Sequence, residues 1–215
     1  MDERATGLVL RLHPLTESSL IVHWLTPDCG RLVTVAKGAR RPKSAFRGQL
    51  DLFYLADFSF QRSRRSELHA LREVSLRDPH RGLRSDLNRL QQACYAAALI
   101  VQTTEPETPL PIFFALLHGL LRHLSEHPPQ PTVILAFEIK LLNELGLAPD
   151  LATKSLSPGA SQVLQRLLAS DWSLIPVLRP SQLQIIEAAG FLGRFARDHL
   201  ERAPTGRDSA LMLRG

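Results

Sequence analysis

The sequence predicts an α+β protein, with a small five-stranded β-barrel in its N-terminal part and an all-helical domain after it. The first observation is a change in apolar periodicity. Before residue 80 the apolar residues alternate or form short β-rich runs, and after residue 85 they recur every three or four residues. The second is a change in charge: residues 1–85 carry 15 Lys+Arg and 9 Asp+Glu, whereas residues 86–215 carry 11 and 12. We therefore expect domains at residues 1–80 and 81–215, with any polyanionic partner at the first.

Five segments of the N-terminal part have the composition of β-strands. They run over Gly7 to Leu12, Leu20 to Leu25, Leu32 to Ala36, Leu50 to Phe60, and Leu68 to Leu76. Thr26 to Gly30 has Pro, Asp and Gly at turn positions and predicts a hairpin. Five short strands with basic connections fit a closed barrel of the OB type, whose face and loops commonly bind nucleic acid. A small β-sandwich fits the strand count nearly as well.

The C-terminal part predicts five helices. A possible Ser85 cap precedes the first, which carries apolar residues from Leu87 to Val101, and Thr108-Pro109 opens the second. Ile134, Phe137, Leu141 and Leu145 define a third, which stops at Gly146. Ser157-Pro158 and Pro180-Ser181 open two more, over Val163 to Leu168 and Leu183 to Leu200. Pro204 to Gly215 has weak signals, and we expect an irregular tail there.

Val35 to Phe53 is the stretch that points most directly to a function. It holds five cations within eleven residues and no carboxylate among them: Lys37, Arg40, Arg41, Lys43 and Arg47. Gly38, Pro42 and Gly48 disfavour a helix there. Such a loop is an electrostatic footprint for phosphate, although a basic loop that only keeps a protein soluble has the same composition.

The aromatic residues of the predicted strands allow two interpretations. Tyr54, Phe58, Phe60 and Trp24 could stack on unpaired bases. Alternation along a strand places about half of its side chains in the barrel core, where an aromatic residue only packs. We favour the core for Phe58 and Phe60.

Metal and membrane functions have little support. Cys29 and Cys94 are too few for a disulfide framework or a thiolate zinc site, and they indicate a reducing compartment. The start of the sequence does not read as a secretory signal, and the longest apolar run, Ala96 to Val101, is too short to cross a bilayer. We expect a soluble, cytoplasmic protein.

Catalytic motifs are also missing. Gly38 to Ser44 differs from a phosphate-binding P-loop because Pro42 stands where the second glycine belongs. His123 and His127 are spaced to share a metal, but they close a helix, where cationic side chains commonly interact with the last carbonyls. We expect no cofactor, no metal and no enzymatic activity.

An extended series of motifs resembles the bacterial RecO family of recombination mediators. In chain order these are Thr16 to Leu20, Thr26 to Arg31, the AKGAR signature within Val35 to Arg40, Phe46-Arg47-Gly48 with Leu50 and Phe53, and Phe137-Glu138 to Pro149. The match covers both halves of the chain. One departure is that many members carry a four-cysteine zinc module after the residue that corresponds to Pro149, and Asp150 to Ser157 holds no cysteine.

The resemblance implies an OB fold followed by a helical domain, here without the zinc module. It implies a protein that binds single- and double-stranded DNA, anneals complementary strands without a nucleotide cofactor and helps to load the RecA recombinase in DNA repair. The implied protein partners are RecR and the acidic tail of single-stranded-DNA-binding protein. It implies a mediator and not an enzyme.

The candidate site residues follow from these considerations. For phosphate contacts we expect first the five loop cations Lys37, Arg40, Arg41, Lys43 and Arg47, and second Arg31, Arg62, Arg64, Arg65 and Arg72. The resemblance suggests a groove for the tail peptide in the helical domain, with Arg122, Phe137 and Lys140 as lining residues, although packing inside the domain also explains Phe137.

Two alternatives from other classes stay open. An RNA-associated OB-fold protein would use the same basic loop, and competition between matched RNA and DNA would distinguish it. A protein-binding adaptor would leave the loop idle, and failure to bind any polynucleotide at low salt would favour it.

Overall fold

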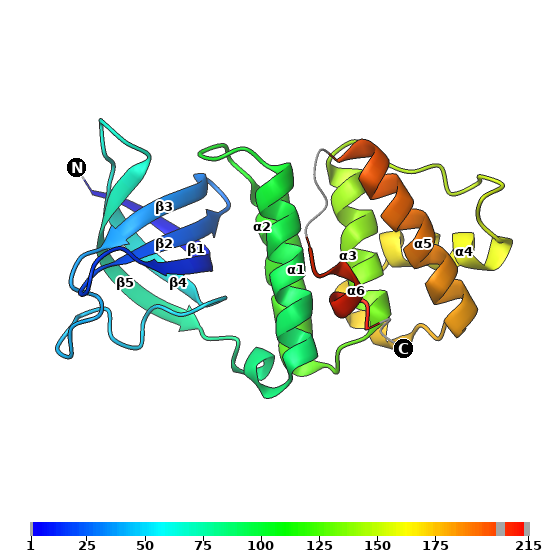
Figure 1. Ribbon diagram of the computed structural model, residues 1–215, viewed down its shortest axis with the longest axis horizontal. Helices are drawn as coiled ribbons and strands as arrows, with labels where there is room; N and C mark the ends of the chain where they lie inside the picture. Colours follow the sequence, from blue (N-terminus) through cyan, green and yellow to red (C-terminus); the bar gives the residue numbers. More distant parts are fainter. Residues whose placement is uncertain (1, 201–204, 213–215) are drawn as a thin grey trace. The chain divides into compact units, whose positions relative to one another are not determined.

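The computed structural model describes residues 2–200 and 205–212, and it shows a five-stranded β-barrel followed by helices (Figure 1). This confirms the predicted fold class. The chain divides into two compact units. The barrel unit contains Met1–His80 and Glu105–Ala115, and the helical unit contains Arg81–Thr104 and Leu116–Gly215.

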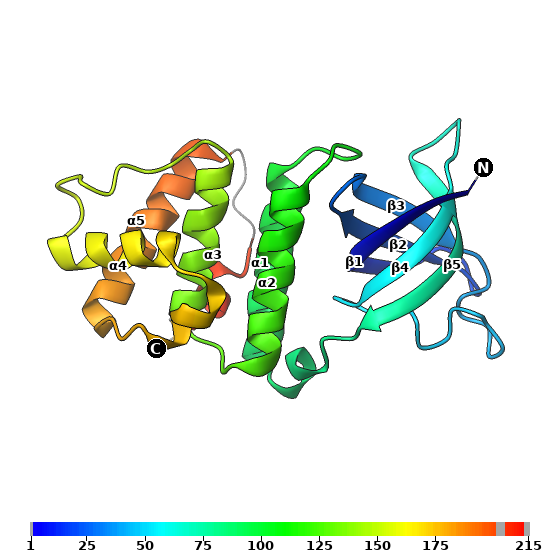
Figure 2. The same ribbon diagram turned by 180° about the vertical axis from the view of Figure 1, so that it is seen from behind.

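The barrel strands are β1 (Asp2–Pro14), β2 (Leu20–Thr26), β3 (Gly30–Ala36), β4 (Leu55–Gln61) and β5 (Leu68–Asp78). They close in the order β1-β2-β3-β5-β4 (Figure 2). Neighbouring strands are antiparallel except β3 and β5, which pair in parallel from Val33–Leu68 to Val35–Ala70. The predicted hairpin between β2 and β3 is present, and Gly30 at its end has a φ of 66°, which glycine adopts without steric cost.

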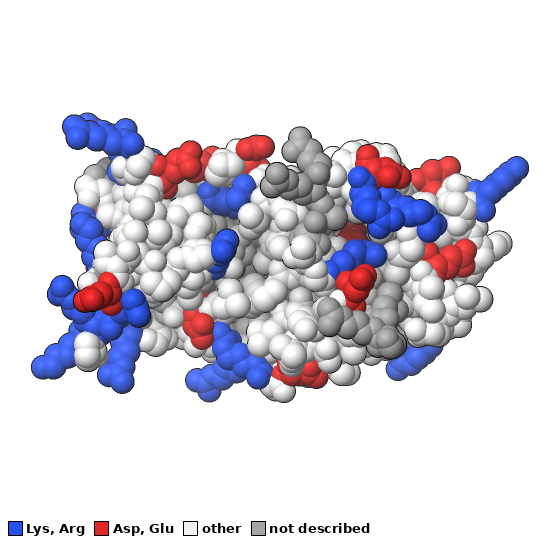
Figure 3. Space-filling view, in the orientation of Figure 1, with Lys and Arg blue, Asp and Glu red and all other residues white. Residues whose placement is uncertain are grey.

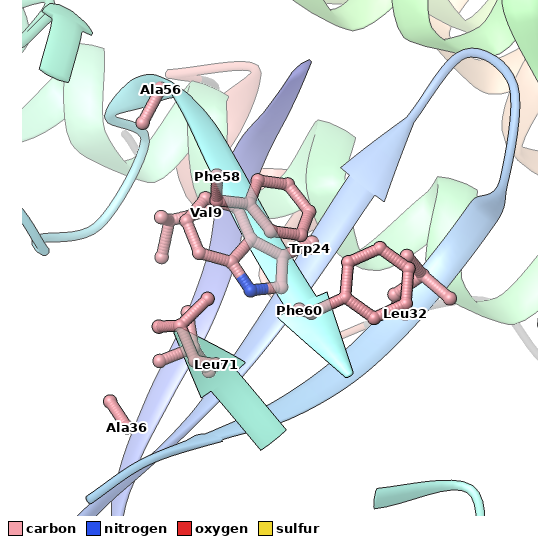
Figure 4. Close-up of a cluster of buried hydrophobic side chains, with 9 residues drawn as sticks. Val9, Trp24, Leu32, Ala36, Ala56, Phe58, Phe60 and Leu71 are labelled. Atoms are coloured by element: carbon pink, nitrogen blue, oxygen red, sulfur yellow. The ribbon is translucent and has the colours of Figure 1, made fainter. Parts of the chain in front are cut away.

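Aromatic rings fill the barrel (Figure 4). Trp24 stacks on Phe58 with ring centroids 4.1 Å apart, and its indole Nε1 donates to Thr34 Oγ1 at 2.9 Å. Phe58 and Phe60 are buried, as expected. Trp24 has no exposed surface, so in this structure it belongs to the core and is not a platform for bases.

The predicted strand from Leu50 to Phe60 is wrong in its first half, because β4 begins only at Leu55. Phe53 has a φ of 62°, which is incompatible with extended backbone, yet its ring is buried and its N–H donates to Val9 O at 2.8 Å. The Asp51 side chain accepts from the Leu52 N–H at 2.7 Å and stabilises the turn just before it. Residues 37–54 therefore form one long connection between β3 and β4, which we call the basic loop.

The segment Glu105–Ala115 packs on the β2–β3 hairpin within the barrel unit. The Glu107 N–H donates to Arg31 O at 3.1 Å, and the Leu110 N–H donates to Pro27 O at 2.9 Å. A Cβ atom on Gly30 would lie 1.9 Å from the carbonyl oxygen of Thr108. The backbone of Gly30 and the backbone of Thr108 are therefore in direct contact, and only glycine at position 30 leaves room for this contact.

The helical unit begins with a short 3₁₀ helix, η1 (Arg81–Ser85), and contains a second one, η2 (Trp172–Val177). The α-helices of the chain are α1 (Leu87–Thr103), α2 (Pro111–Glu126), α3 (Pro131–Glu144), α4 (Pro158–Ala169), α5 (Gln182–His199) and α6 (Arg207–Ala210). As predicted, α3 is followed by Gly146, with a φ of 73°, and Ser157 and Ser181 cap α4 and α5.

Two predicted helix starts are wrong by one or two residues. Asp86 caps α1 in place of Ser85, because its carboxylate accepts from the Asn88 N–H, whereas Ser85 donates to Gly82 O inside η1. Helix α2 starts at Pro111 and not at Thr108-Pro109. The first bond that leads into it, from the Phe114 N–H to Leu110 O, comes after the segment that packs on the hairpin.

The predicted irregular tail lies partly outside the described residues, and within residues 205–212 the prediction is wrong. Helix α6 forms there, and Ala210 and Leu211 are fully buried. The Ala210 carbonyl accepts from the buried Gln92 amide of α1 at 2.9 Å. This end of the chain is thus part of the helical core.

Candidate nucleic-acid interface

The basic loop is a chain of tight turns. Its backbone N–H groups donate to carbonyls three residues earlier, and the donor–acceptor pairs are Ala39–Ala36, Arg41–Gly38, Ser44–Arg41, Arg47–Ser44 and Gln49–Phe46. Gly38 and Gly48 take positive φ angles of 71° and 72°, so the glycines hold conformations that other residues resist. The loop is long, but its backbone is hydrogen-bonded within itself.

Several contacts attach the loop to the barrel. The Arg40 N–H donates to Ser18 O at 3.0 Å, which ties the loop to the β1–β2 connection. Gln49 Oε1 accepts from the Leu76 N–H of β5 at 2.8 Å. Phe46 packs partly against the barrel core. A loop held in this way presents its side chains at a lower entropy cost than a free one.

All five loop cations are exposed. Arg40 Nη1 donates to Thr16 O, and Arg47 Nη1 donates to Pro42 O. Within the described residues none of the five has a carboxylate partner. Figure 3 shows the resulting cluster of Lys and Arg side chains at the lower left, over the β3–β4 connection. The positive field at this loop is therefore not cancelled by local ion pairs.

The second group of predicted cations is divided. Arg64 and Arg65 are exposed in the β4–β5 connection. Arg72 contacts Gln61 and lies 4.0 Å from an Asp2 carboxylate oxygen. Arg31 is half-buried, and burial lowers its pKa, while the nearby Glu105 acts in the opposite direction.

Arg62 differs most from the prediction, because two carboxylates hold it. Its Nε and Nη2 donate to Glu3 at 2.9 and 3.2 Å, and its Nη1 donates to Glu107 at 2.5 Å. The hydrogen bond to Glu3 raises the pKa of Arg62. His69, almost fully buried, lies 3.1 Å from the other oxygen of Glu107. Its Nδ1 accepts from the Ser63 N–H, so its Nε2 donates to that oxygen.

A groove of about 810 Å³ on the barrel unit was not predicted. It is lined by residues of β1, β4 and β5, by Ala45 and Phe46 of the basic loop, and by Asp28 of the β2–β3 turn. These residues are scattered along the sequence, so no local pattern indicates the groove.

The helical unit places its three predicted residues differently. Arg122 is exposed on α2, whereas Phe137 on α3 is fully buried and packs in the core. Lys140 is half-buried and donates to Leu168 O at 2.6 Å, and burial lowers its pKa. Of the three, only Arg122 stands free at the surface, and the role of the group in binding a protein stays a prediction.

The histidine pair His123 and His127 forms a stack with ring centroids 4.6 Å apart. His127 Nδ1 lies 3.2 Å from the His123 carbonyl oxygen, which agrees with a helix-closing role. Within residues 2–200 and 205–212 no group of three or more His, Cys, Asp or Glu side chains could hold a metal ion. In the same residues no helix is both long and apolar enough for a membrane span.

Two family models match this chain. The model described as "Recombination protein O N terminal" matches residues 1–80, and the one described as "Recombination protein O C terminal" matches residues 84–157. Together they cover more than half of the chain, in the same order as the barrel and the first helices.

Curated relatives agree with the family models. A protein named DNA repair protein RecO from Anaeromyxobacter sp. (strain K) is 35% identical over 148 residues, which are 69% of this chain and 58% of the relative. The protein of the same name from Bacillus subtilis (strain 168) is 30% identical over 151 residues, 70% of this chain and 58% of the relative. The match thus spans less than two thirds of these relatives.

Proposed function

Because the chain belongs to the RecO family of DNA repair and recombination proteins, we propose that it is a recombination mediator that binds DNA through its basic loop. In this proposal it binds single and double strands, anneals complementary strands without a nucleotide cofactor, and helps to load the RecA recombinase. The observation that carries the proposal is a loop of five exposed cations without a carboxylate partner among the described residues.

Phosphate is the ligand that this loop fits. Arg and Lys neutralise phosphates and release the condensed counterions of the strand, which supplies affinity without reading sequence. The turns of the loop distribute the cations over Lys37 to Arg47, so that one backbone can meet several of them. Since the anchors to Ser18 and Leu76 already order the loop, little additional ordering is required on binding.

Annealing follows from the same charges. Two complementary strands repel each other until part of their phosphate charge is neutralised, and a basic surface reduces that repulsion. Base pairing then supplies the free energy. No covalent bond is made or broken, so the proposed activity requires no catalytic group.

The protein partners belong to the same proposal. The tail of single-stranded-DNA-binding protein is acidic, and Arg122 is the exposed cation of the predicted lining set. Lys140 is held by the Leu168 carbonyl and would have to exchange that partner to reach a peptide. Binding to RecR has its support in family membership alone.

The deciding experiment measures strand binding and annealing by the purified chain, with labelled complementary oligonucleotides at low salt. We expect binding to single and double strands and annealing faster than the spontaneous rate. An unlabelled RNA of matched sequence that competes better than DNA would favour the RNA-associated alternative. Absence of binding to any polynucleotide would leave the adaptor alternative.

A further inference from the structure

The groove of the barrel unit continues from the basic loop. Phe46, one of its lining residues, lies in the sequence between the loop cations Lys43 and Arg47. Most of the rest of its wall comes from β1, β4 and β5, of which β4 pairs with both of the others, and Asp28 of the β2–β3 turn adds to it. The register of these strands sets Thr6 opposite Asp57 and Asp57 opposite Ser75, and sets Arg4 opposite Ser59 and Ser59 opposite Glu73. A nucleic-acid strand that binds the basic loop near Phe46 would therefore lie next to the groove.

The groove is rich in hydrogen-bond acceptors. Serine and threonine hydroxyls line it together with the carboxylates of Asp57, Glu73 and Asp28. Asp57 is already engaged, because it accepts from Thr6 Oγ1 at 2.6 Å and from Arg77 Nε at 2.5 Å. The Glu73 side chain is exposed and has no hydrogen-bond or ion-pair partner among the described residues. Free carboxylate oxygens repel phosphate and accept from the N–H groups of bases.

Cations stand at the groove as well. Arg4 and Arg72 are exposed and belong to its lining. Arg72 contacts Gln61, while Arg4 has no hydrogen-bond or ion-pair partner among residues 2–200 and 205–212. The surface thus has two parts. The cations of the loop and of the groove lining suit the phosphates of a nucleic acid, and the acceptor-rich wall of the groove suits its bases.

We propose that this groove takes unpaired nucleobases of a single strand whose phosphates lie on the basic loop. Phe46 is partly exposed and lines the groove, so its ring offers a face for stacking, and Glu73 offers an acceptor for base amino groups. The volume of about 810 Å³ is within the range of pockets that hold small organic ligands, so a base with its sugar fits. The inference rests on the proposed DNA binding and adds a preference for single strands, because the bases of a duplex are paired.

The test compares two single strands of equal length and phosphate number, one with normal bases and one abasic throughout. We expect the wild-type chain to bind the strand with bases at least about fivefold more tightly, the equivalent of about 1 kcal/mol, the lower end for stacking of one base. Phe46→Leu removes the aromatic face but keeps an apolar side chain. Ser75→Leu adds bulk at an exposed groove position without adding an aromatic face. Both should bring the affinity ratio close to one.

Two controls separate this inference from the proposed function. Ser173→Leu adds the same side chain at an exposed position of η2 and should keep the wild-type ratio. A variant in which Arg40, Arg41, Lys43 and Arg47 are replaced by Gln should bind both strands more weakly and keep the ratio. A wild-type ratio of one, or a ratio that persists in both groove variants while their melting temperatures match the wild type, would overturn the groove alone. If the wild type binds neither strand, the proposed function fails with it.

Discussion

Arg207 of α6 donates two hydrogen bonds to the carboxylate of Glu138 on α3, from Nε at 2.7 Å and from Nη2 at 2.8 Å. The two side chains are 18% and 6% exposed, so the pair is largely withdrawn from water. Tyr95 of α1 donates its hydroxyl to the same carboxylate at 2.6 Å, and burial raises the pKa of that hydroxyl. Arg207 also donates to the Ala189 carbonyl of α5. One ion pair thus connects the end of the chain to three helices.

We expect Arg207→Met to lower the free energy of unfolding by about 3–5 kcal/mol, because it leaves the Glu138 charge buried without its partner. Denaturant unfolding of the purified chain measures this. Adding Glu138→Gln to the variant removes the stranded charge and should restore part of the loss. Arg194→Met, at an exposed position of α5, is the matched control. A loss below about 1 kcal/mol would mean that the ion pair contributes no more than an exposed one.

His123 makes stability depend on pH. Burial lowers its pKa to about 4 from the usual 6.5, and the positive charge of the stacked His127 acts in the same direction, against a hydrogen bond with the Trp172 backbone. The unfolded chain therefore binds a proton between these two pH values that the folded chain does not bind. Stability is complete above pH 6.5 and is lost as pH falls toward 4.

We expect this residue to cost the chain about 2 kcal/mol of stability between pH 7 and pH 5. Unfolding curves give the change in the free energy of unfolding between pH 7 and pH 5 for the wild type and for His123→Gln. The difference between these two changes is the contribution of His123. His199→Gln removes an exposed histidine from α5 and should keep the wild-type pH dependence. Equal pH dependence in the wild type and His123→Gln would show that His123 titrates normally.

The fold was predictable to a large extent because it depends on periodicity. Alternation located all five strands, and capping residues such as Ser157 and Ser181 located two helix starts. The start of β4 could not be predicted, since the buried ring of Phe53 looks like strand in the sequence while its backbone is left-handed. The role of Arg207 could not be predicted either, because its partner Glu138 lies 69 positions earlier in the chain.

The candidate site was also predictable only in part. The loop cations are contiguous in sequence, so composition alone marked them. In the sequence Arg62 looks like the loop cations. In the fold it has two carboxylate partners: pairing of β1 with β4 brings Glu3 to it, and the segment that packs on the β2–β3 hairpin brings Glu107. The groove is assembled from three strands, the basic loop and the β2–β3 turn, and no local pattern describes it. The sequence shows where charged residues occur, but only the fold determines which of them form ion pairs.

Arg62 gives a prediction from that pairing. Because two carboxylates already neutralise it, we expect Arg62→Gln to leave the slope of log K against log salt for single strands unchanged. Stability should fall by no more than about 1 kcal/mol, since its side chain is 38% exposed and the pairs are screened by solvent. Arg64→Gln, at an exposed neighbour, is the comparison. A slope that flattens by about 0.7 in Arg62→Gln would show that Arg62 leaves its carboxylates to meet a phosphate.

Zinc should not be required for folding. Within the described residues no group of three or more His, Cys, Asp or Glu side chains could hold a metal ion, and burial raises the pKa of the half-buried Cys29, which disfavours a zinc-binding thiolate. We expect protein purified without a tag to contain far less than one zinc per chain and to keep its melting temperature when a chelator is added. A melting temperature that falls with chelator would contradict this.

The basic loop itself is tested by counting charges. Replacing Arg40, Arg41, Lys43 and Arg47 with Gln keeps polarity and approximate length and removes four exposed cations. If each neutralises one phosphate, the slope of log K against log salt should flatten by about 0.7 per contact on single strands and about 0.9 on duplex, or roughly 3 in total. Affinity should fall alike for every base sequence, since phosphate contacts position the strand without reading it.

Annealing should slow in the same variant, because it depends on the same neutralisation of two polyanions. The fold should survive, because the anchors that hold the loop to Ser18 and Leu76 use the Arg40 backbone and the Gln49 side chain, and neither is removed. The variant loses the side-chain bonds from Arg40 to the Thr16 carbonyl and from Arg47 to the Pro42 carbonyl, and both lie at exposed positions. An unchanged slope in a folded variant would make the loop a solubility feature and would move the phosphate contacts to Arg64 and Arg65 of the β4–β5 connection and to Arg72 of β5.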